Sequence, residues 1–313
     1  MPTLADVAKR ANVSKMTVSR VINHPEQVTD ELKELVFSAM AELDYRPNIA
    51  AKALVTNRSQ IIKLFILEEI DTTEPYYMNL LMGIAKRIGK AHYSLQLVTN
   101  DAFDVGSCDG YIITGVRKKD FDWIDRLEKP VVLFGENSEG YDYVDSDNEY
   151  GTAKATQYAL DYQTIIYIGI EVDEPFEISR ETGYLSVMKE VDLPSKILRF
   201  PNHSTEVERY MTENWADFTD KTCFVCSSDR LALGAVRGII NAGGHLPEEF
   251  GVIGFDGVFL DQISSPKLTT IKQDIIRMGE VCGEMLLKKI EEKGASQGYR
   301  RFFPELVIRE TTN

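Results

Sequence analysis

A short segment near the N-terminus carries side chains that can recognise the bases of double-stranded DNA. Lys15, Met16, Ser19 and Arg20 fall on one face of a helix expected from position 14 onward. An arginine can hold a guanine through two hydrogen bonds in the major groove, and a methionine methyl group can contact the methyl group of thymine. The spacing alone fits equally well a small helical domain with a solvated basic face, so the neighbouring elements must decide.

Those neighbouring elements have the pattern of a helix-turn-helix. Apolar residues recur at i, i+3, i+4 and i+7 in the first helix, at Leu4, Val7, Ala8 and Ala11. Thr3 and Asp6 can form a capping box at its start, and Ser14 can cap the second helix. A third helix from position 29 closes the core. In this motif the second helix enters the major groove of DNA.

A short helical segment follows the three helices. Residues 49–54 favour a helix of only about two turns, which is too short to be stable alone in water. A helix of small residues that ends in an exposed leucine can pair with its twin and wedge that leucine into a base step of the minor groove. Leu54 is the candidate for that leucine.

The first part of the chain resembles the headpiece and hinge of the LacI/GalR family of bacterial repressors. The resemblance lies in the runs TLADVAKRANVSKMTVSRVIN and AMAELDYRPNIAAKAL, without a gap. It implies that Lys15 and Met16 select operator bases, that Arg20 adds a base contact and that Leu54 intercalates. The full set of DNA-binding residues that it implies is Ser14, Lys15, Met16, Thr17, Ser19, Arg20, Asn23, Ala51 and Leu54.

The remainder of the chain alternates strands and helices, which predicts parallel sheets covered on both faces. The expected strands are 62–67, 95–99, 111–114, 131–135, 165–170, 222–226 and 251–255. The expected helices lie around 78–91, 149–161, 180–190, 205–215, 230–242 and 275–292. The sequence has no glycine-rich dinucleotide or phosphate-binding loop. We therefore expect two doubly wound subdomains with a ligand crevice beyond the strand ends.

The same family resemblance extends into this part. The segments EPYYMNLLMGI, CDGYIITG, SRETGYLSVM, CSSDRLALGAVRGIINAGGHLPEEFGVIGFDG and PKLTTIKQD carry it. It implies a two-lobed α/β body like the periplasmic sugar-binding proteins, behind an all-α headpiece. The implied parts are a headpiece at 1–46, a hinge and linker at 47–60, a first lobe at 61–160 and 274–298, and a second lobe at 161–273 and 299–313. A last strand at 302–308 would belong to the second lobe.

The resemblance also implies a set of effector-binding residues. They are Tyr76, Tyr77, Arg180, His203, Asp229 and Asp256. An aspartate and an arginine that oppose each other can fix the donors and acceptors of a polyol, and aromatic rings can stack on a sugar. Three of these residues also have a structural alternative: Asp256 as a turn cap, Arg180 as the partner of Glu181, and Tyr76 as core.

Three departures from the family pattern bear on the ligand. Only nine residues separate Thr99 from Asp109, too few for an average helix of about 11 residues with its turns. The first lobe is therefore expected to be trimmed there. The usual Gly-His before the 165–170 strand is replaced by residues 161–163, and Ser228 stands where the family has asparagine. The last change touches the pocket, so ligand identity does not follow by analogy.

An enzyme is the main alternative from another class. Cys223 and Cys226 have redox or half-zinc spacing, but they lie in an apolar strand without a second pair, which favours buried core. The histidines are scattered without metal-ligand spacing, and residues 227–229 lack a histidine partner for a triad. We therefore expect no catalytic residue, no metal site and no cofactor.

The acidic residues are concentrated away from the N-terminal end. The formal net charge is −14; residues 1–60 hold eight Lys and Arg against seven Asp and Glu, and residues 61–313 hold 27 against 42. Such asymmetry suits a DNA-contacting head on an acidic body, because phosphate contact needs only local positive charge. The chain has no apolar run of about 18 residues, and its first residues do not have the pattern of a secretion signal. We expect a cytoplasmic protein, which also disfavours a secreted solute-binding protein.

The resemblance implies a transcriptional regulator, in the form of a repressor of carbohydrate-related genes. It would bind a palindromic double-stranded DNA operator as a homodimer, under control of a sugar or sugar derivative in the cleft between the lobes. The sequence does not distinguish an inducer from a corepressor, or a small molecule from a protein corepressor.

Overall fold

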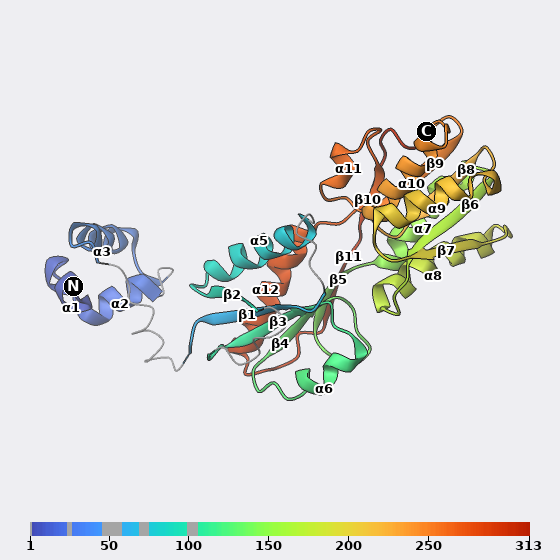
Figure 1. The fold of residues 1–313 in the computed structure, drawn as a ribbon. Coiled ribbons are helices and arrows are strands. Elements are labelled where there is room, and N and C mark those ends of the chain that lie inside the picture. The colour runs from blue at the N-terminus through green and yellow to red at the C-terminus, as the bar shows by residue number, and fades with distance from the viewer. Residues whose placement is uncertain (1, 24–26, 46–57, 69–74, 99–105) are drawn as a thin grey trace. The chain divides into compact units, whose positions relative to one another are not determined.

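The computed structural model describes residues 2–23, 27–45, 58–68, 75–98 and 106–313 (Figure 1). The chain divides into two compact units, Met1–Ser59 and Gln60–Asn313. Ala51, Leu54 and most of the expected hinge lie outside the described residues. Among the described helices, none is both long enough and apolar enough to cross a membrane.

The first unit contains three helices, α1 (Leu4–Arg10), α2 (Lys15–Asn23) and α3 (Asp30–Glu42). Thr3 and Asp6 form the expected capping box of α1. The backbone N–H of Thr17 donates to Ser14 Oγ at 3.0 Å, so Ser14 caps α2. Asn12 turns the chain between α1 and α2 with φ 51°, a left-handed conformation that asparagine tolerates better than most residues. The core is apolar, with Val7, Val18, Val21 and Val36 fully buried.

The second unit contains two six-stranded sheets, and the first is entirely parallel. Its order is β11-β5-β4-β3-β1-β2. The strands are β1 (Ile61–Ile66), β2 (Ser94–Val98), β3 (Gly110–Thr114), β4 (Val131–Phe134), β5 (Tyr143–Ser146) and β11 (Tyr299–Phe302). Helices α5 (Pro75–Gly89) and α12 (Ile275–Glu291) share one core with the sheet, and α6 (Phe121–Ile124) follows η2 (Lys118–Asp120) beside a second core cluster. We call this sheet and its helices the first lobe.

The second sheet has the order β12-β10-β9-β8-β6-β7 and is parallel except at β12. Its strands are β6 (Thr164–Ile170), β7 (Lys196–Phe200), β8 (Thr222–Cys226), β9 (Phe250–Asp256), β10 (Thr269–Lys272) and β12 (Glu305–Val307). Its helices are α7 (Asn148–Tyr158), α8 (Pro175–Glu190), α9 (Ser204–Glu213), α10 (Asp229–Asn241) and α11 (Leu260–Ile263), with η3 (Ala159–Asp161) and η4 (Trp215–Asp217). Two separate core clusters cover its two faces, which makes it a doubly wound sheet, the second lobe.

The points at which the chain passes between the lobes correct two expected boundaries. Ala155 and Ala159 pack into a core cluster of the second sheet, so the first crossing lies just after β5 and not near 160. Tyr299 pairs with Tyr143 of β5 in the first sheet, so the segment from 299 to 302 belongs to the first lobe and not the second. The single strand expected at 302–308 is divided into β11 and β12 around Pro304, which has no N–H to donate to a ladder.

Candidate functional site

The exposed face of α2 is the first candidate site. Met16 is 72% exposed, and Lys15 and Arg20 are exposed beside it. The opposite face of α2 buries Val18 and Val21 completely, which fixes the direction in which the exposed side chains project. A rigidly held helix with two cations and a methyl-bearing side chain on its open face has the chemistry of major-groove recognition.

The polar residues of the helix start are placed to support that face. Ser14 Oγ and Thr17 Oγ1 lie 2.8 Å apart and share a hydrogen bond. Ser19 is half-buried. Asn23 ends α2, but its side chain lies outside the described residues, as do Ala51 and Leu54.

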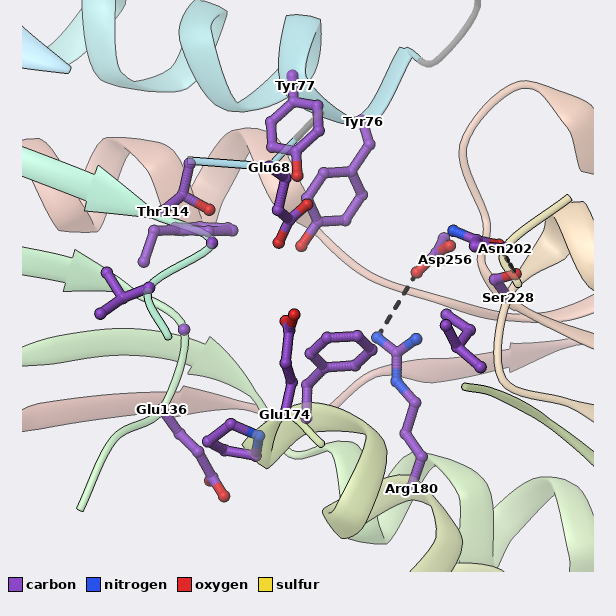
Figure 2. A pocket seen from close by; sticks show the side chains of 17 residues that line it. Glu68, Tyr76, Tyr77, Thr114, Glu136, Glu174, Arg180, Asn202, Ser228 and Asp256 are labelled. Carbon is purple, nitrogen blue, oxygen red and sulfur yellow. Dashed lines mark hydrogen bonds and ion pairs between the residues drawn. The ribbon is translucent and has the colours of Figure 1, made fainter. Parts of the chain in front are cut away.

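The second candidate site is a cavity between the two lobes, at the carboxyl ends of strands from both sheets (Figure 2). About 860 Å³ of space lies between its walls, and part of that space is open solvent. Its first-lobe wall includes Glu68, Tyr76, Tyr77, Thr114, Phe134 and Glu136. Its second-lobe wall includes Glu174, Phe176, Arg180, Asn202, Ser228 and Asp256. The placement agrees with the rule that open α/β sheets bind ligands beyond their strand ends.

Arg180 is held firmly in the second-lobe wall. Its Nε donates to Asn148 Oδ1 at 2.9 Å, and its Nη1 donates to the backbone oxygen of Ser227. The guanidinium lies 3.8 Å from the ring centroid of Phe255, a cation–π contact. Arg180 is 6% exposed, so the remaining donors face the cavity from a preorganised position.

Asp256 faces Arg180 across the wall, with 3.6 Å between Asp256 Oδ1 and Arg180 Nη2. Gln273 Nε2 also donates to Asp256 Oδ1, at 2.9 Å. The φ of Asp256 is 119°, an uncommon backbone conformation for a residue with a side chain. Strained residues of this kind cluster at ligand sites, and here the strain turns the chain immediately after β9.

Asp229 does not line the cavity, contrary to the expectation for an effector contact. It is buried at the start of α10 and accepts hydrogen bonds from the Gly257 backbone N–H at 2.9 Å and from Thr270 Oγ1 at 2.5 Å. Burial and the nearby Asp256 carboxylate raise the pKa of Asp229 well above its usual value. Asp229 therefore supports the loop that carries Asp256, and its own oxygens are engaged there.

His203 is also absent from the cavity wall. It is exposed and precedes α9, and its neighbour Asn202 lines the cavity instead. Ser228 Oγ donates to Asn202 Oδ1 at 3.0 Å, which joins two wall residues (Figure 2). In this loop, a shift of one residue decides whether Asn202 or His203 points into the cavity. Sequence similarity in a loop does not fix the position to within one residue.

Aromatic side chains supply the apolar part of the first-lobe wall. Tyr76 and Tyr77 open α5, and their rings meet edge to face at 5.4 Å. Tyr76 also contacts Phe134, with ring centroids 6.3 Å apart. Burial raises the pKa of the Tyr76 hydroxyl well above its usual value, with smaller contributions from Asp145 and Asp256. Tyr76 therefore remains a neutral hydroxyl that can donate or accept.

Three glutamates of the cavity were not predicted. Glu68 follows β1 by two residues, Glu136 follows β4 by two residues, and Glu174 precedes α8. Glu136 accepts from Ser179 Oγ at 2.9 Å and pairs with Arg301 at 2.9 Å. The signal that could have found the first two is position, because polar residues just beyond parallel strands face the ligand crevice.

The described residues contain no group of three or more histidine, cysteine or acidic side chains placed to hold a metal ion. Cys223 and Cys226 are buried free thiols in β8. Burial raises the pKa of both thiols, which keeps them protonated and disfavours redox chemistry.

Two family models match the chain. Residues 3–48 match the model described as bacterial regulatory proteins, lacI family, and residues 157–312 match the periplasmic binding protein-like domain. The HTH-type transcriptional regulator YvdE of Bacillus subtilis (strain 168) is 54% identical over 315 residues, which covers 100% of each chain.

Two solved structures share the fold. The transcriptional regulator CelR in complex with cellobiose superposes with a TM-score of 0.74 at 24% identity, covering 99% of this chain and 100% of that one. The lac repressor dimer bound to operator and the anti-inducer ONPF gives a TM-score of 0.75 at 22% identity, covering 99% of each chain.

Proposed function

The chain belongs to the LacI family of bacterial regulatory proteins and is a DNA-binding transcriptional regulator, and from this premise we propose that a small molecule in the inter-lobe cavity controls its grip on a palindromic operator. The proposal adds the operator symmetry, the dimer, the effector and the effector site. Since the target is chromosomal DNA, we also propose a cytoplasmic location. Its most direct support is that one chain carries both a helix with an exposed cationic face and a polar cavity between two lobes.

Operator recognition rests on the exposed face of α2. We propose that Lys15, Met16 and Arg20 contact base edges, while Ser14, Thr17, Ser19 and Asn23 hold phosphates or position the helix. To test this, the full chain is used to select the sequences that it binds from a pool of random DNA. The affinity for the selected site is then measured by titration. Arg20→Ala should relax sequence preference at one position and cost about 1–3 kcal/mol. Lys288→Ala, which removes the same charge from α12, is the control and should change nothing.

Dimerisation follows from the use of one short recognition helix per chain. Two copies on a two-fold axis would place their α2 helices in successive major grooves, which requires a palindromic site. We propose that Ala51 and Leu54 pair with those of the second copy and that Leu54 enters the minor groove. Leu54→Ala should then weaken binding to the selected site strongly and leave ligand binding unchanged. Sedimentation at several protein concentrations tests the dimer directly, and operator binding by a monomer would contradict it.

Effector control rests on the opposed Arg180 and Asp256. We propose that a sugar or sugar derivative bridges the lobes at this pair, and that lobe closure shifts the population of the DNA-binding conformation. CelR, a protein of the same fold, has a structure with cellobiose. A thermal-shift screen of the full chain against saccharides and polyols tests the site. A ligand at 100 times its dissociation constant should stabilise the protein by about 2.7 kcal/mol.

A further inference from the structure

Among the residues that the structure describes, four carboxylates and one guanidinium line the inter-lobe cavity. The carboxylates belong to Glu68, Glu136, Glu174 and Asp256, and the guanidinium belongs to Arg180. A site for a phosphorylated or carboxylated ligand needs donors and positive charge that the protein has not already used. The composition of this wall therefore bears on the charge of the ligand.

The positive charge of Arg180 is already compensated. Its three nitrogens each meet a protein acceptor, at Asn148 Oδ1, at the Ser227 backbone oxygen and at Asp256 Oδ1. Phe255 covers one face of the guanidinium. Arg180 can still donate its remaining N–H groups to a hydroxyl or carbonyl, but it offers no two-pronged grip for an anion.

Glu68 and Glu174 extend toward each other from opposite walls of the cavity (Figure 2). Glu68 lies over Gly115, whose φ is 71°; a Cβ there would come within 2.5 Å of Glu68 Cγ. A side chain at position 115 would thus displace Glu68, so its place depends on that glycine. Glu174 is 8% exposed, and its Oε1 accepts from Arg117 Nε of the first lobe at 3.1 Å. Glu68 therefore packs directly against Gly115, and the Glu174 carboxylate is held by Arg117.

Two opposed carboxylates suit a ligand that brings hydrogen-bond donors and no negative charge. A carboxylate accepts strong hydrogen bonds from hydroxyls, whereas an anionic group between two carboxylates meets repulsion from both walls. A ligand whose hydroxyls donate to both glutamates would also draw the two lobes together. We propose that this cavity takes an uncharged polyhydroxyl ligand, that it rejects phosphorylated and acidic ones, and that Glu68 and Glu174 accept ligand hydroxyls from opposite walls.

This inference rests on the proposed function, in that the cavity must be the effector site. The first experiment measures melting shifts and dissociation constants of the full chain with matched pairs of probes. The uncharged probes are glucose, ribose, cellobiose and maltose; the charged ones, all anionic, are glucose 6-phosphate, ribose 5-phosphate and gluconate. We expect at least one uncharged saccharide to bind and its charged counterparts to bind at least tenfold more weakly. A preference for a phosphate or an acid, or no saccharide binding at all, would overturn the inference.

The second experiment replaces the two glutamates by their uncharged isosteres. Glu68→Gln and Glu174→Gln should each weaken binding of the preferred saccharide about tenfold, since a hydrogen bond to a charged acceptor becomes one to a neutral amide oxygen. In the double variant, the affinities for a sugar and for its phosphate ester should differ less than in the wild type. Glu171→Gln, an exposed neighbour that does not line this cavity, is the matched control and should bind as the wild type does. Unchanged affinity in both single variants would contradict the assigned roles.

Arg180→Ala separates the two levels of the proposal. Loss of saccharide binding in Arg180→Ala, together with a preference for a phosphate ester in the wild type, would overturn only the charge selectivity. Saccharide binding that survives Arg180→Ala and both glutamate variants would place the ligand elsewhere and overturn the effector site itself. Operator affinity of each variant without ligand shows that the protein is folded and active.

Discussion

Ser146 and Gln273 are joined by a hydrogen bond of 2.6 Å between Ser146 Oγ and Gln273 Oε1. Ser146 is the last residue of β5 and Gln273 follows β10, so the bond links two of the segments by which the chain passes between the lobes. The amide nitrogen of the same Gln273 donates to Asp256 at the cavity. A change in the hydrogen bonds of Asp256 therefore has a direct route to the crossing segments.

Gln273→Ala should weaken the link between the cavity and the crossing segments. Gln273 is 4% exposed, and its loss removes one hydrogen bond each from the buried Ser146 and Asp256, which costs roughly 1–3 kcal/mol of the free energy of unfolding. Urea unfolding measures that cost. Gln262→Ala, at an exposed residue of α11, is the control and should change stability by less than about 0.5 kcal/mol. Equal effects of the two changes would show that the buried link contributes nothing.

The effector response should be lost in Arg180→Ala while operator binding persists. The substitution removes the contacts to Asn148, Ser227 and Asp256, and it leaves the Asp256 carboxylate buried without its counter-charge. Arg180→Lys keeps the positive charge but lacks the planar guanidinium with its paired donors. Compared with Arg180→Ala, it should therefore regain more of the stability than of the ligand response. The measurements are operator affinity with and without ligand, and thermal unfolding. A normal response in Arg180→Ala would remove this residue from the effector site.

Asp145 should make the protein less stable as pH rises from about 4 to 7. Burial raises the pKa of this carboxyl to about 6, against the opposing effect of hydrogen bonds from the backbone N–H groups of Glu136 and Ser146. The folded state therefore holds a proton that the unfolded state releases near 3.8, and the difference amounts to roughly 3 kcal/mol. Asp145→Asn cannot titrate, so its stability relative to the wild type should improve over that pH range. Urea unfolding at several pH values measures the change.

The stability contributed by Asp142 should depend on pH in the opposite direction to that of Asp145. Burial raises the pKa of Asp142, but hydrogen bonds from Lys289 and Ser296 more than offset this and lower the pKa below its usual value. Asp142 therefore stabilises the folded state at pH values above its pKa in the unfolded chain. This contribution is lost as the pH falls through its pKa in the folded state. Asp142→Asn should be destabilised at pH 7, and the deficit should shrink in acid. Parallel pH profiles for the two variants would contradict both assignments.

Much of the fold could be predicted because its signals are local. Strands β1, β3, β6, β8 and β9 are mostly apolar, although β1 contains Lys63, and helices α5, α10 and α12 have regular apolar spacing. β5 has the sequence YVDS and β10 the sequence TTIK, which read as polar loops. Both are short strands whose pairing with neighbours, and not their composition, makes them strands. β7 is an edge strand with two charged residues and was missed for the same reason.

The cavity was less predictable than the fold because side-chain direction at strand ends depends on tertiary packing. Arg180 and Asp256, which were expected to contact the effector, both line the cavity wall. Asp229 instead turns inward to Thr270 and Gly257, a choice that no local pattern reveals. Glu174 was missed because its partner Arg117 lies in the other lobe. The segment 99–105, where the first lobe was expected to be trimmed, lies outside the described residues.

Two glycines of α5 should respond to alanine in opposite directions. A Cβ on Gly83 would come within 2.1 Å of the backbone oxygen of Ile276, because α5 and α12 pack closely there. Backbone cannot yield as a flexible side chain can, so Gly83→Ala should separate the helices and cost about 1–3 kcal/mol of the free energy of unfolding. A Cβ on Gly89 meets nothing within 4 Å, and Gly89→Ala should stabilise the protein by about 0.5–1 kcal/mol through reduced freedom of the unfolded chain. Urea unfolding of both variants measures the difference. If Gly83→Ala left the free energy of unfolding unchanged, the contact between α5 and α12 would be looser than the structure shows. The first-lobe wall that carries Tyr76 and Tyr77 would then be looser as well.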